Sequence, residues 1–432
     1  MGANGMNQEE LMEYAAEKKT DETENTALVD MVNQKHYDIT VVMGANYGDE
    51  GKGRMTDYFA DKAIKAGKKT IVVCSNGGAQ RGHTVRLDNG YTHMFHHLGS
   101  GTLAGADTYL PQSFIVNPML FMKEMRELYQ FLQDTPKIFV HPDCLISTPF
   151  DMMNNQIIED ARGDKKHGSV GAGIWETIFR NGASMFEMSQ MSNENLFNYL
   201  KWIRDKYSTN RHFTKSYLPK MDEALKSWEK IFYNDNMIHN YILDFRKMED
   251  LITYSNGYKL MDYDSIIFEN GQGLCIGQDM GDIYTTPSYT GITEPKKIID
   301  KVFKANKLSY DVEACYVSRT YLTRHGMGML ENEYYDVPEF VRLDTESNIE
   351  SKYQGKFRYG DIKDIYLPIA LGNFDLSKSN TADYNMSIAY THCDEYFPGI
   401  ITNINSKTYY VFGPRRGDAV DEFKGINKDI TE

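Results

Sequence analysis

The 432-residue sequence contains few cysteines and no long hydrophobic run. The five cysteines, spread from Cys74 to Cys393, are odd in number and far apart, which argues against a disulfide framework or a zinc knuckle and fits a reducing compartment. No stretch approaches the roughly 18 apolar residues that read as a membrane span, and the opening MGANGMNQEE lacks a signal peptide's apolar segment. We expect a soluble cytoplasmic protein (of the host cell, if the chain is viral) with no membrane partner.

Positive charge is also scarce, because the formal net charge is −14 at pH 7. A general nucleic-acid-binding protein would carry a basic face, so we expect no nucleic-acid partner. Small anionic ligands need only local positive charge and stay possible. A hydrophobic content of 41%, with 12% aromatic residues, is enough for a substantial core.

The chain divides into a polar N-terminal extension and one large domain. Residues 1–36 are rich in Glu, Asn, Thr and Lys, which predicts a flexible extension. From residue 37 to 432, short β-branched runs such as YDITVVMG (37–44) alternate with stretches of helical spacing such as 52–67. This alternation predicts an α/β fold, a single large domain with a mostly parallel central sheet flanked by helices. Residues 219–255 are amphipathic and predict a helical subdomain.

The loop GANYGDEGKGR (residues 44–54) follows the first predicted strand. A P-loop reads G-x-x-x-x-G-K-[ST] between a strand and a helix. Here Gly44 lies two positions too early, and Gly53 stands where Ser or Thr would bind Mg²⁺. The glycine pattern alone is compatible with phosphate binding and with a plain tight turn.

Two carboxylates, Asp49 and Glu50, lie in the middle of this loop. An acid beside phosphates is tolerable if it binds Mg²⁺ or takes a proton from a bound substrate. Asp49 fits either role, and it also fits the simpler role of a helix N-cap.

The same stretch closely resembles the N-terminal motif of adenylosuccinate synthetases, a strand followed by G-x-x-x-G-D-E-G-K-G-[KR]. Further family motifs have counterparts in the same order, up to about residue 417. These counterparts are NGGAQRGHTV (76–85), FHHLGSG (95–101), NPMLFMKEMREL (117–128), ARGDKKHGSVGAGI (161–174), FENGQG (268–273), TRHGMG (323–328) and FGP (412–414).

The resemblance implies a ligase of purine nucleotide biosynthesis that joins L-aspartate to C6 of a 6-oxopurine nucleoside monophosphate. Oxide is too poor a leaving group for direct displacement by an amine. A nucleoside triphosphate therefore phosphorylates the purine oxygen first, and this step needs a base near N1, Mg²⁺ and donors around the phosphoryl group.

By this resemblance Asp49 is the base and, with the carbonyl of Gly82, a Mg²⁺ ligand, while His83 is the acid. The donor's phosphates are expected at Gly48, Glu50, Gly51, Lys52, Gly53 and Thr84, and its base and ribose at Lys378, Asn380, Gly413 and Pro414. The acceptor nucleotide is expected at Asn46, Gln80, Ser169, Val170, Gln272 and Thr286. Arg180 lies near the place where the family sends an arginine into the acceptor site of the partner subunit, which implies a homodimer.

The sequence departs from the family at several of these positions. In place of a run of arginines, the aspartate loop offers Lys356 and Arg358, and the arginine for the acceptor's ribose hydroxyl is lost, which would suit a deoxyribose. Asn380 replaces the acid that reads guanine, so ATP or dATP becomes plausible beside GTP as donor.

Gln80 and Val170 replace an asparagine and a threonine of the family, and both changes reshape the acceptor pocket. Together these departures resemble a divergent viral branch that acts on dGMP and makes 2-amino-2'-deoxy-N6-succinyladenylate. The sequence therefore favours dGMP as acceptor. The alternative is an ordinary enzyme acting on IMP with GTP, and the remote rivals are a P-loop-like nucleotide kinase or GTPase and an inactive nucleotide-binding protein.

Overall fold

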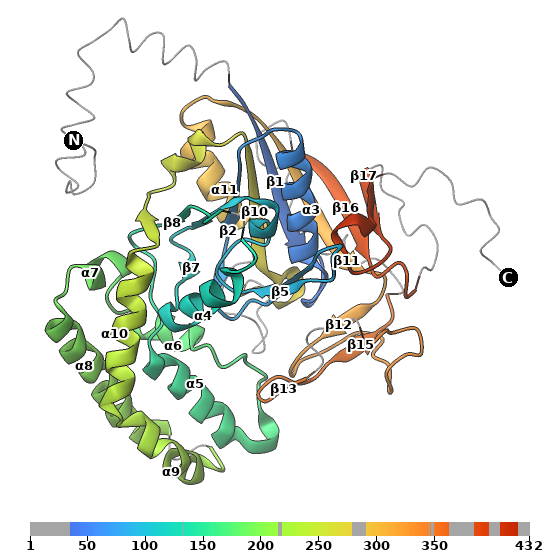
Figure 1. Ribbon diagram of the computed structural model, residues 1–432. Helices are drawn as coiled ribbons and strands as arrows, with labels where there is room; N and C mark the ends of the chain where they lie inside the picture. The colour runs from blue at the N-terminus through green and yellow to red at the C-terminus, as the bar shows by residue number, and fades with distance from the viewer. Residues whose placement is uncertain are drawn as a thin grey trace, which may run out of the picture.

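A ten-stranded sheet forms the centre of the computed structural model (Figure 1). The structure describes residues 35–132, 134–214, 218–278, 291–344, 346, 350–362, 384–396 and 407–421. In spatial order the strands are β18 (Ala419–Asp421), β17 (Lys407–Val411), β16 (Tyr384–Thr391), β11 (Ser309–Arg319), β1 (His36–Gly44), β10 (Ser265–Gly273), β2 (Thr70–Cys74), β6 (Asp107–Leu110), β8 (Ile138–Val140) and β9 (Ile252–Tyr254).

Every neighbouring pair in this sheet is parallel except β17 and β18, which are antiparallel at one edge. The prediction of an α/β fold with a mostly parallel central sheet is therefore confirmed. The order β11–β1–β10–β2 places the strand that precedes the glycine loop in the middle of the sheet.

The central strand β1 is buried on both faces, which is why its sequence is almost continuously apolar. Ile39, Val41 and Met43 pack into one hydrophobic cluster, whereas Val42 packs into another with Met55 of helix α3 (Lys52–Lys65). Helix α3 thus covers one face of the sheet beside β1 (Figure 1).

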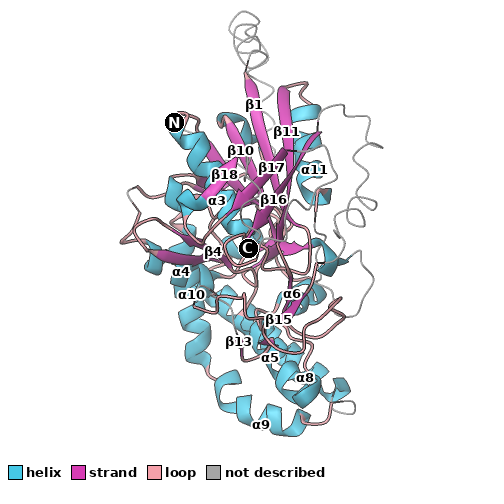
Figure 2. Ribbon diagram, turned by 90° about the vertical axis from the view of Figure 1, so that its right-hand side faces the viewer, coloured by secondary structure: helices cyan, strands magenta, loops and turns pink. Residues whose placement is uncertain are grey.

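The remaining helices gather mainly at one end of the sheet, where Figures 1 and 2 show α5, α8, α9 and α10 below it. They are α4 (Pro118–Leu128), α5 (Pro149–Arg162), α6 (Ile174–Arg180), α7 (Met185–Ser189), α8 (Asn193–Thr214), α9 (Met221–Phe232), α10 (Asp235–Glu249) and α11 (Thr293–Ile299). Among the described helices, none has the length and apolar character needed to cross a membrane.

The region 219–255 holds α9 and α10 and ends in β9, which joins the main sheet beside β8. Phe232 and Tyr241 of these helices share a hydrophobic cluster with Leu110 and Val140 of the sheet. The helices and this part of the sheet are therefore built on one core.

Short pairs of strands lie outside the main sheet and frame its carboxyl edge. They are β3 (Gly77–Gly78) with β7 (Phe114–Ile115), β4 (His83–Arg86) with β5 (Thr92–Phe95), β12 (Leu322–Arg324) with β15 (Arg358–Gly360), and β13 (Glu350–Ser351) with β14 (Gly355–Lys356). Because parallel strands end at the same edge, the loops that follow β1, β10, β11 and β16 converge there, where open α/β sheets bind their ligands.

Candidate active site

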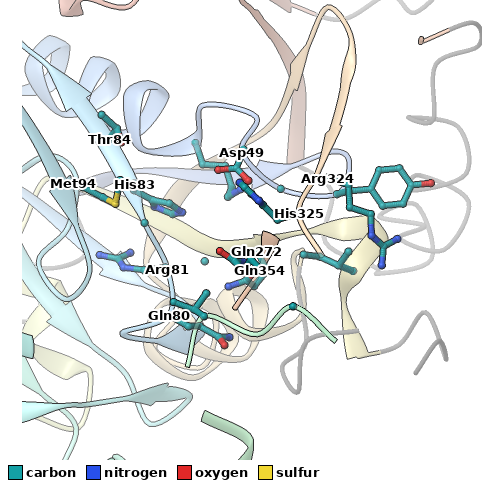
Figure 3. A pocket seen from close by; sticks show the side chains of 18 of the residues that line it. Asp49, Gln80, Arg81, His83, Thr84, Met94, Gln272, Arg324, His325 and Gln354 are labelled. Atoms are coloured by element: carbon teal, nitrogen blue, oxygen red, sulfur yellow. The ribbon is translucent and has the colours of Figure 1, made fainter. Parts of the chain in front are cut away.

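A cavity of about 840 Å³ lies at this edge. It collects residues from loops that follow several central strands, and Figure 3 shows Asp49, His83 and Gln272 around the same space. Its lining includes most of the residues predicted from the sequence: Gly48, Asp49, Gly51, Lys52, Gly53, Gln80, Gly82, His83, Thr84, Ser169, Val170, Gln272, Gly413 and Pro414.

The glycine loop adopts a conformation that most residues avoid. Gly48 and Gly51 have φ values of 107° and 96°, and Asp49, between them, has a φ of 59°. A non-glycine residue in this region is uncommon and costs about 1–3 kcal/mol, so surrounding contacts must hold it.

Distant residues supply these contacts by donating to the loop's carbonyl groups. The Gly48 carbonyl accepts from the Thr323 hydroxyl (3.1 Å), and the Asp49 carbonyl accepts from Nε of Arg319 (2.7 Å). The Glu50 carbonyl accepts from the Thr391 hydroxyl at 2.7 Å. Side chains of strands β11, β12 and β16 therefore hold the loop through hydrogen bonds to its carbonyl groups.

The carboxylate of Glu50 points into the protein and organises the loop. It accepts from the amides of Asn46 (3.2 Å) and Gly48 (2.8 Å) and lies 2.5 Å from Nζ of Lys52. Burial raises the pKa of this carboxyl group, but Lys52 and the backbone amides outweigh that effect and lower it. A Cβ at Gly44 would lie 2.4 Å from Oε2 of Glu50, so glycine is needed there.

Two residues that the sequence assigned to the site, Glu50 and Asn46, lie outside the cavity lining. Glu50 does not line the cavity, because its side chain is turned inward, and the Gly48 amide already donates to it. Asn46 does not line the cavity either, since its side-chain amide donates to the Ser318 hydroxyl at 2.6 Å. These residues shape the loop from within.

Helix α3 begins at the cavity with Lys52, Gly53 and Arg54 in its lining. Its N-cap, Gly51, provides no side-chain cap, and its first turn carries no acidic residue. The unsatisfied N–H groups at a helix N-terminus favour anions. The first turn of α3 therefore suits the phosphates of a nucleotide.

The predicted catalytic pair, Asp49 and His83, lies in one cavity although the residues come from different loops. Nδ1 of His83 lies 2.7 Å from Oε1 of Glu269. Its Nε2 is buried and has no hydrogen-bond partner in the described part of the chain. Burial lowers the pKa of the His83 imidazole, and Glu269 opposes that shift.

Glu269 is itself fully buried, in the middle of β10, and pairs with Nη1 of Arg81 at 3.0 Å. Burial raises the pKa of the Glu269 carboxyl group, but Arg81 and His83 outweigh it and hold the pKa well below its usual range. Glu269 lies in the FENGQG motif and Arg81 in NGGAQRGHTV, but neither was predicted as a site residue from the sequence.

The residues predicted for the acceptor nucleotide come from several segments of the chain. Gln272 lies near the C-terminal end of β10, and the hydroxyl of Ser169 donates to Oδ1 of Asn155 in α5 at 3.1 Å. Val170 lines the cavity with 42% of its surface exposed. The predicted sites Thr286, Lys378 and Asn380 fall outside the described residues.

Arg180 forms a buried ion pair with Asp151. Its Nε and Nη2 donate to the two carboxylate oxygens of Asp151 at 2.9 and 3.0 Å, and Nη2 also donates to the Ile146 carbonyl. Both side chains are almost fully buried. This pairing gives no support to the prediction that Arg180 reaches a partner's acceptor site, because the buried guanidinium is held by Asp151.

The predicted aspartate-binding residues, Lys356 and Arg358, also lie outside the cavity lining. Nε of Arg358 donates to Glu333 at 2.7 Å, and its Nη1 donates to the carbonyls of Gly326 and Gly328. Arg324 lines the cavity instead; its Nη1 donates to a backbone carbonyl and its guanidinium lies 5.2 Å from the Tyr47 ring. The TRHGMG motif contains Arg324, so the resemblance to the family could have identified this arginine as a site residue.

The segment predicted for the donor's base and ribose, Gly413 and Pro414, is followed by Arg416, which forms ion pairs with helix α3. Nε and Nη2 of Arg416 each lie 2.7 Å from a carboxylate oxygen of Asp57, and Nη1 lies 3.4 Å from Asp61. These ion pairs connect the segment after β17 to the helix that starts at the cavity.

Comparisons with known proteins agree with this picture. The family model for adenylosuccinate synthetase matches residues 41–353. Adenylosuccinate synthetase of Microcystis aeruginosa is 26% identical over 68% of this chain and 62% of its own length, and that of Pelodictyon phaeoclathratiforme is 27% identical over 69% and 65%. The matched region thus spans less than two thirds of these curated relatives.

Two solved structures share the fold. Adenylosuccinate synthetase from Plasmodium falciparum, fully ligated, has a TM-score of 0.59 at 20% identity, covering 83% of this chain and 77% of its own. The succinoaminodeoxyadenylate synthetase of cyanophage S-2L, bound to dGMP and dATP, has a TM-score of 0.56 at 16% identity, covering 90% and 96%. With a family model matching well over half of its length, the chain belongs to the adenylosuccinate synthetase family.

Proposed function

We propose that the protein is a nucleoside-triphosphate-dependent ligase that joins L-aspartate to C6 of a purine nucleoside monophosphate, with dGMP as the favoured acceptor. One observation carries this proposal. Asp49, His83 and Lys52, a base, an acid and a phosphate-binding cation, line the same cavity at the carboxyl edge of the sheet.

The chemistry follows from these positions. The Asp49 carboxylate accepts the N1 proton of the purine, and O6 then attacks the donor's γ-phosphorus, whose bond to the bridging oxygen breaks. Lys52 and the first-turn amides of α3 hold the phosphoryl groups, with Nε2 of His83 as the proton donor. The aspartate amine next attacks C6, loses a proton, and inorganic phosphate leaves with the original O6.

The oxygen donors present fit a magnesium ion, because the Asp49 carboxylate and the Gly82 backbone both line the cavity and Mg²⁺ is typically held by one or two carboxylates plus substrate phosphates. When bound, Mg²⁺ would offset the negative charge that builds on the transferring phosphoryl group.

Several features support dGMP over IMP. The two oxygens of Asp49 can accept from N1–H and from the 2-amino group of guanine together, whereas hypoxanthine presents only N1–H. Val170 leaves an apolar surface at the acceptor loop. The cyanophage relative of similar fold was bound to dGMP and dATP.

A matrix of acceptors and donors tests the proposal. IMP, dIMP, GMP and dGMP are each combined with ATP, dATP or GTP, Mg²⁺ and L-aspartate, and the succinylated product is measured. We expect the highest kcat/KM with dGMP and with ATP or dATP. A preference for IMP with GTP would support the ordinary synthetase, and nucleotide hydrolysis independent of aspartate would support a kinase or GTPase. If no nucleotide is consumed, the proposed function is wrong.

Arg324 is our proposed site for a carboxylate of L-aspartate, in place of Lys356 and Arg358. Replacing Arg324 with methionine should raise the KM for aspartate by about ten- to a hundredfold, because charge-assisted hydrogen bonds contribute about 1.5–3 kcal/mol. The matched control, Arg358→Met, removes a guanidinium paired with Glu333 outside the cavity and should leave this KM nearly unchanged. The reverse pattern in steady-state kinetics would return the aspartate site to Arg358.

The homodimer implied by the resemblance stays a prediction, and it no longer depends on Arg180. Light scattering across a range of protein concentrations measures the mass directly. A monomer with full activity would exclude a site that needs a partner subunit.

A further inference from the structure

We propose that Glu269 is a positioning residue that fixes His83 as the tautomer protonated at Nδ1, so that Nε2 is the nitrogen presented to ligands in the cavity. The inference deepens the proposed function and rests on it for what His83 does to the substrate. How the imidazole is held rests on geometry alone. The two residues are 186 positions apart in the chain and meet through β4 and β10.

The Glu269 carboxylate is saturated by four donors. Oε2 accepts from Nη1 of Arg81 at 3.0 Å and from the Ser100 amide at 3.1 Å. Oε1 lies 2.7 Å from Nδ1 of His83 and also accepts from the Ser100 hydroxyl. A carboxylate offers about four lone-pair sites and no proton, so the ring nitrogen facing it must carry hydrogen.

These contacts determine which nitrogen of the imidazole carries hydrogen. In the neutral ring only one nitrogen carries hydrogen, and Glu269 holds it at Nδ1, leaving a lone pair at Nε2. In the charged ring Nδ1–H stays on Glu269, and the added proton is at Nε2. Nε2 is buried with no partner in the described part of the chain, and His83 lines the cavity. Nε2 is therefore the ring nitrogen left to meet a bound ligand.

Packing holds the ring in this place. Arg81, which buttresses the carboxylate, is anchored by donating from Nε to the His96 carbonyl at 3.0 Å and from Nη2 to the Leu98 carbonyl at 2.5 Å. On the other side, a Cβ at Gly53 would lie 2.6 Å from Cβ of His83, so the first turn of α3 lies directly against it.

The isosteric variant Glu269→Gln should move the hydrogen of the neutral His83 ring from Nδ1 to Nε2. Its amide has one acceptor oxygen and one donor NH₂. Arg81 and the Ser100 amide can only donate, so the oxygen must face them, and the NH₂ then faces His83. Nδ1 of His83 must become an acceptor, and the neutral ring must move its hydrogen to Nε2. Ser100→Ala is the matched control, because it removes a donor from the same carboxylate oxygen and leaves the His83 contact in place.

The experiment is ¹⁵N NMR of the ¹⁵N-histidine-labelled full chain, in which N–H and lone-pair imidazole nitrogens have well-separated shifts. The His83 signals are assigned among the 11 histidines by their loss in His83→Asn. We expect Nδ1–H in the wild type and in Ser100→Ala, and Nε2–H in Glu269→Gln. A wild-type ring protonated at Nε2 would overturn the inference even if Glu269→Gln fails to fold.

Kinetics supply the second readout. We expect Glu269→Gln to lower kcat by about a hundredfold or more, because a ring that donates from Nε2 also needs a hydrogen at Nδ1, and the introduced amide NH₂ cannot accept it. The three KM values should stay within about threefold of wild type. In the His83→Asn background the same change should add almost nothing. A full additional loss in that background would mark Glu269 as merely structural. If the wild type forms no product while its tautomer is Nδ1–H, the proposed function fails and the positioning of His83 stands.

Discussion

Replacing Asp49 with asparagine should lower kcat for the succinylated product by about 10²–10⁴-fold, the usual contribution of a positioned general base. Asparagine keeps the size of the side chain and tolerates the φ of 59° found at this position. It removes only the charge that takes the N1 proton and that can bind Mg²⁺. We therefore expect the midpoint of thermal unfolding to stay close to that of the wild type.

Two control variants separate the chemistry from the backbone strain. Asp49→Ala should lose the same activity and also some stability, because alanine fits the left-handed region poorly. Asn332→Ala changes another residue with positive φ (45°), at an exposed position that does not line the cavity. It should lose stability and keep kcat. An Asp49→Asn enzyme within tenfold of wild type would remove Asp49 from the mechanism.

The second large effect is expected at Glu50. Glu50→Gln should lower the free energy of unfolding by about 3–5 kcal/mol, because it leaves the buried ammonium of Lys52 without its carboxylate. The two charged atoms are 2.5 Å apart, and both side chains are at most 3% exposed. The double variant Glu50→Gln/Lys52→Met carries no unpaired charge and should recover most of this loss. Denaturant unfolding of both variants and the wild type gives the comparison.

The same pair predicts a pH dependence. The pKa of Glu50 is lower in the folded chain than its ordinary value of 4.5. Its contribution to stability is therefore present above pH 4.5 and is lost as the pH falls below that value, when the unfolded chain binds a proton that the folded chain does not. The free energy of unfolding of the wild type should fall between about pH 7 and about pH 4. In the double variant, the share of this fall that comes from Glu50 should be absent. A Glu50→Gln chain as stable as the wild type at both values would contradict the assignment.

The sequence alone determined the architecture and the edge of the sheet at which the candidate site lies. Three elements follow from local sequence patterns. A β-branched run predicts strand β1, residues that permit positive φ predict the glycine turn, and apolar spacing of helical period predicts helix α3. Because parallel strands end at one edge, the glycine loops that followed these runs were bound to converge. Asp49, Lys52, His83 and Gln272 could be named because the motifs that contain them resemble those of the adenylosuccinate synthetases.

Only the tertiary structure decided the direction and the partner of each charged side chain. Glu50 lies one residue from Asp49 yet turns into the core, and Arg180 pairs with Asp151 in place of reaching outward. Arg358 is held by Glu333, while Arg324 lines the cavity. A buried charge must find an opposite charge or enough hydrogen-bond donors, and which one it meets depends on which strands are neighbours. His83 and Glu269 show this most clearly, because 186 residues separate them in the chain and the order of the sheet brings their side chains to 2.7 Å.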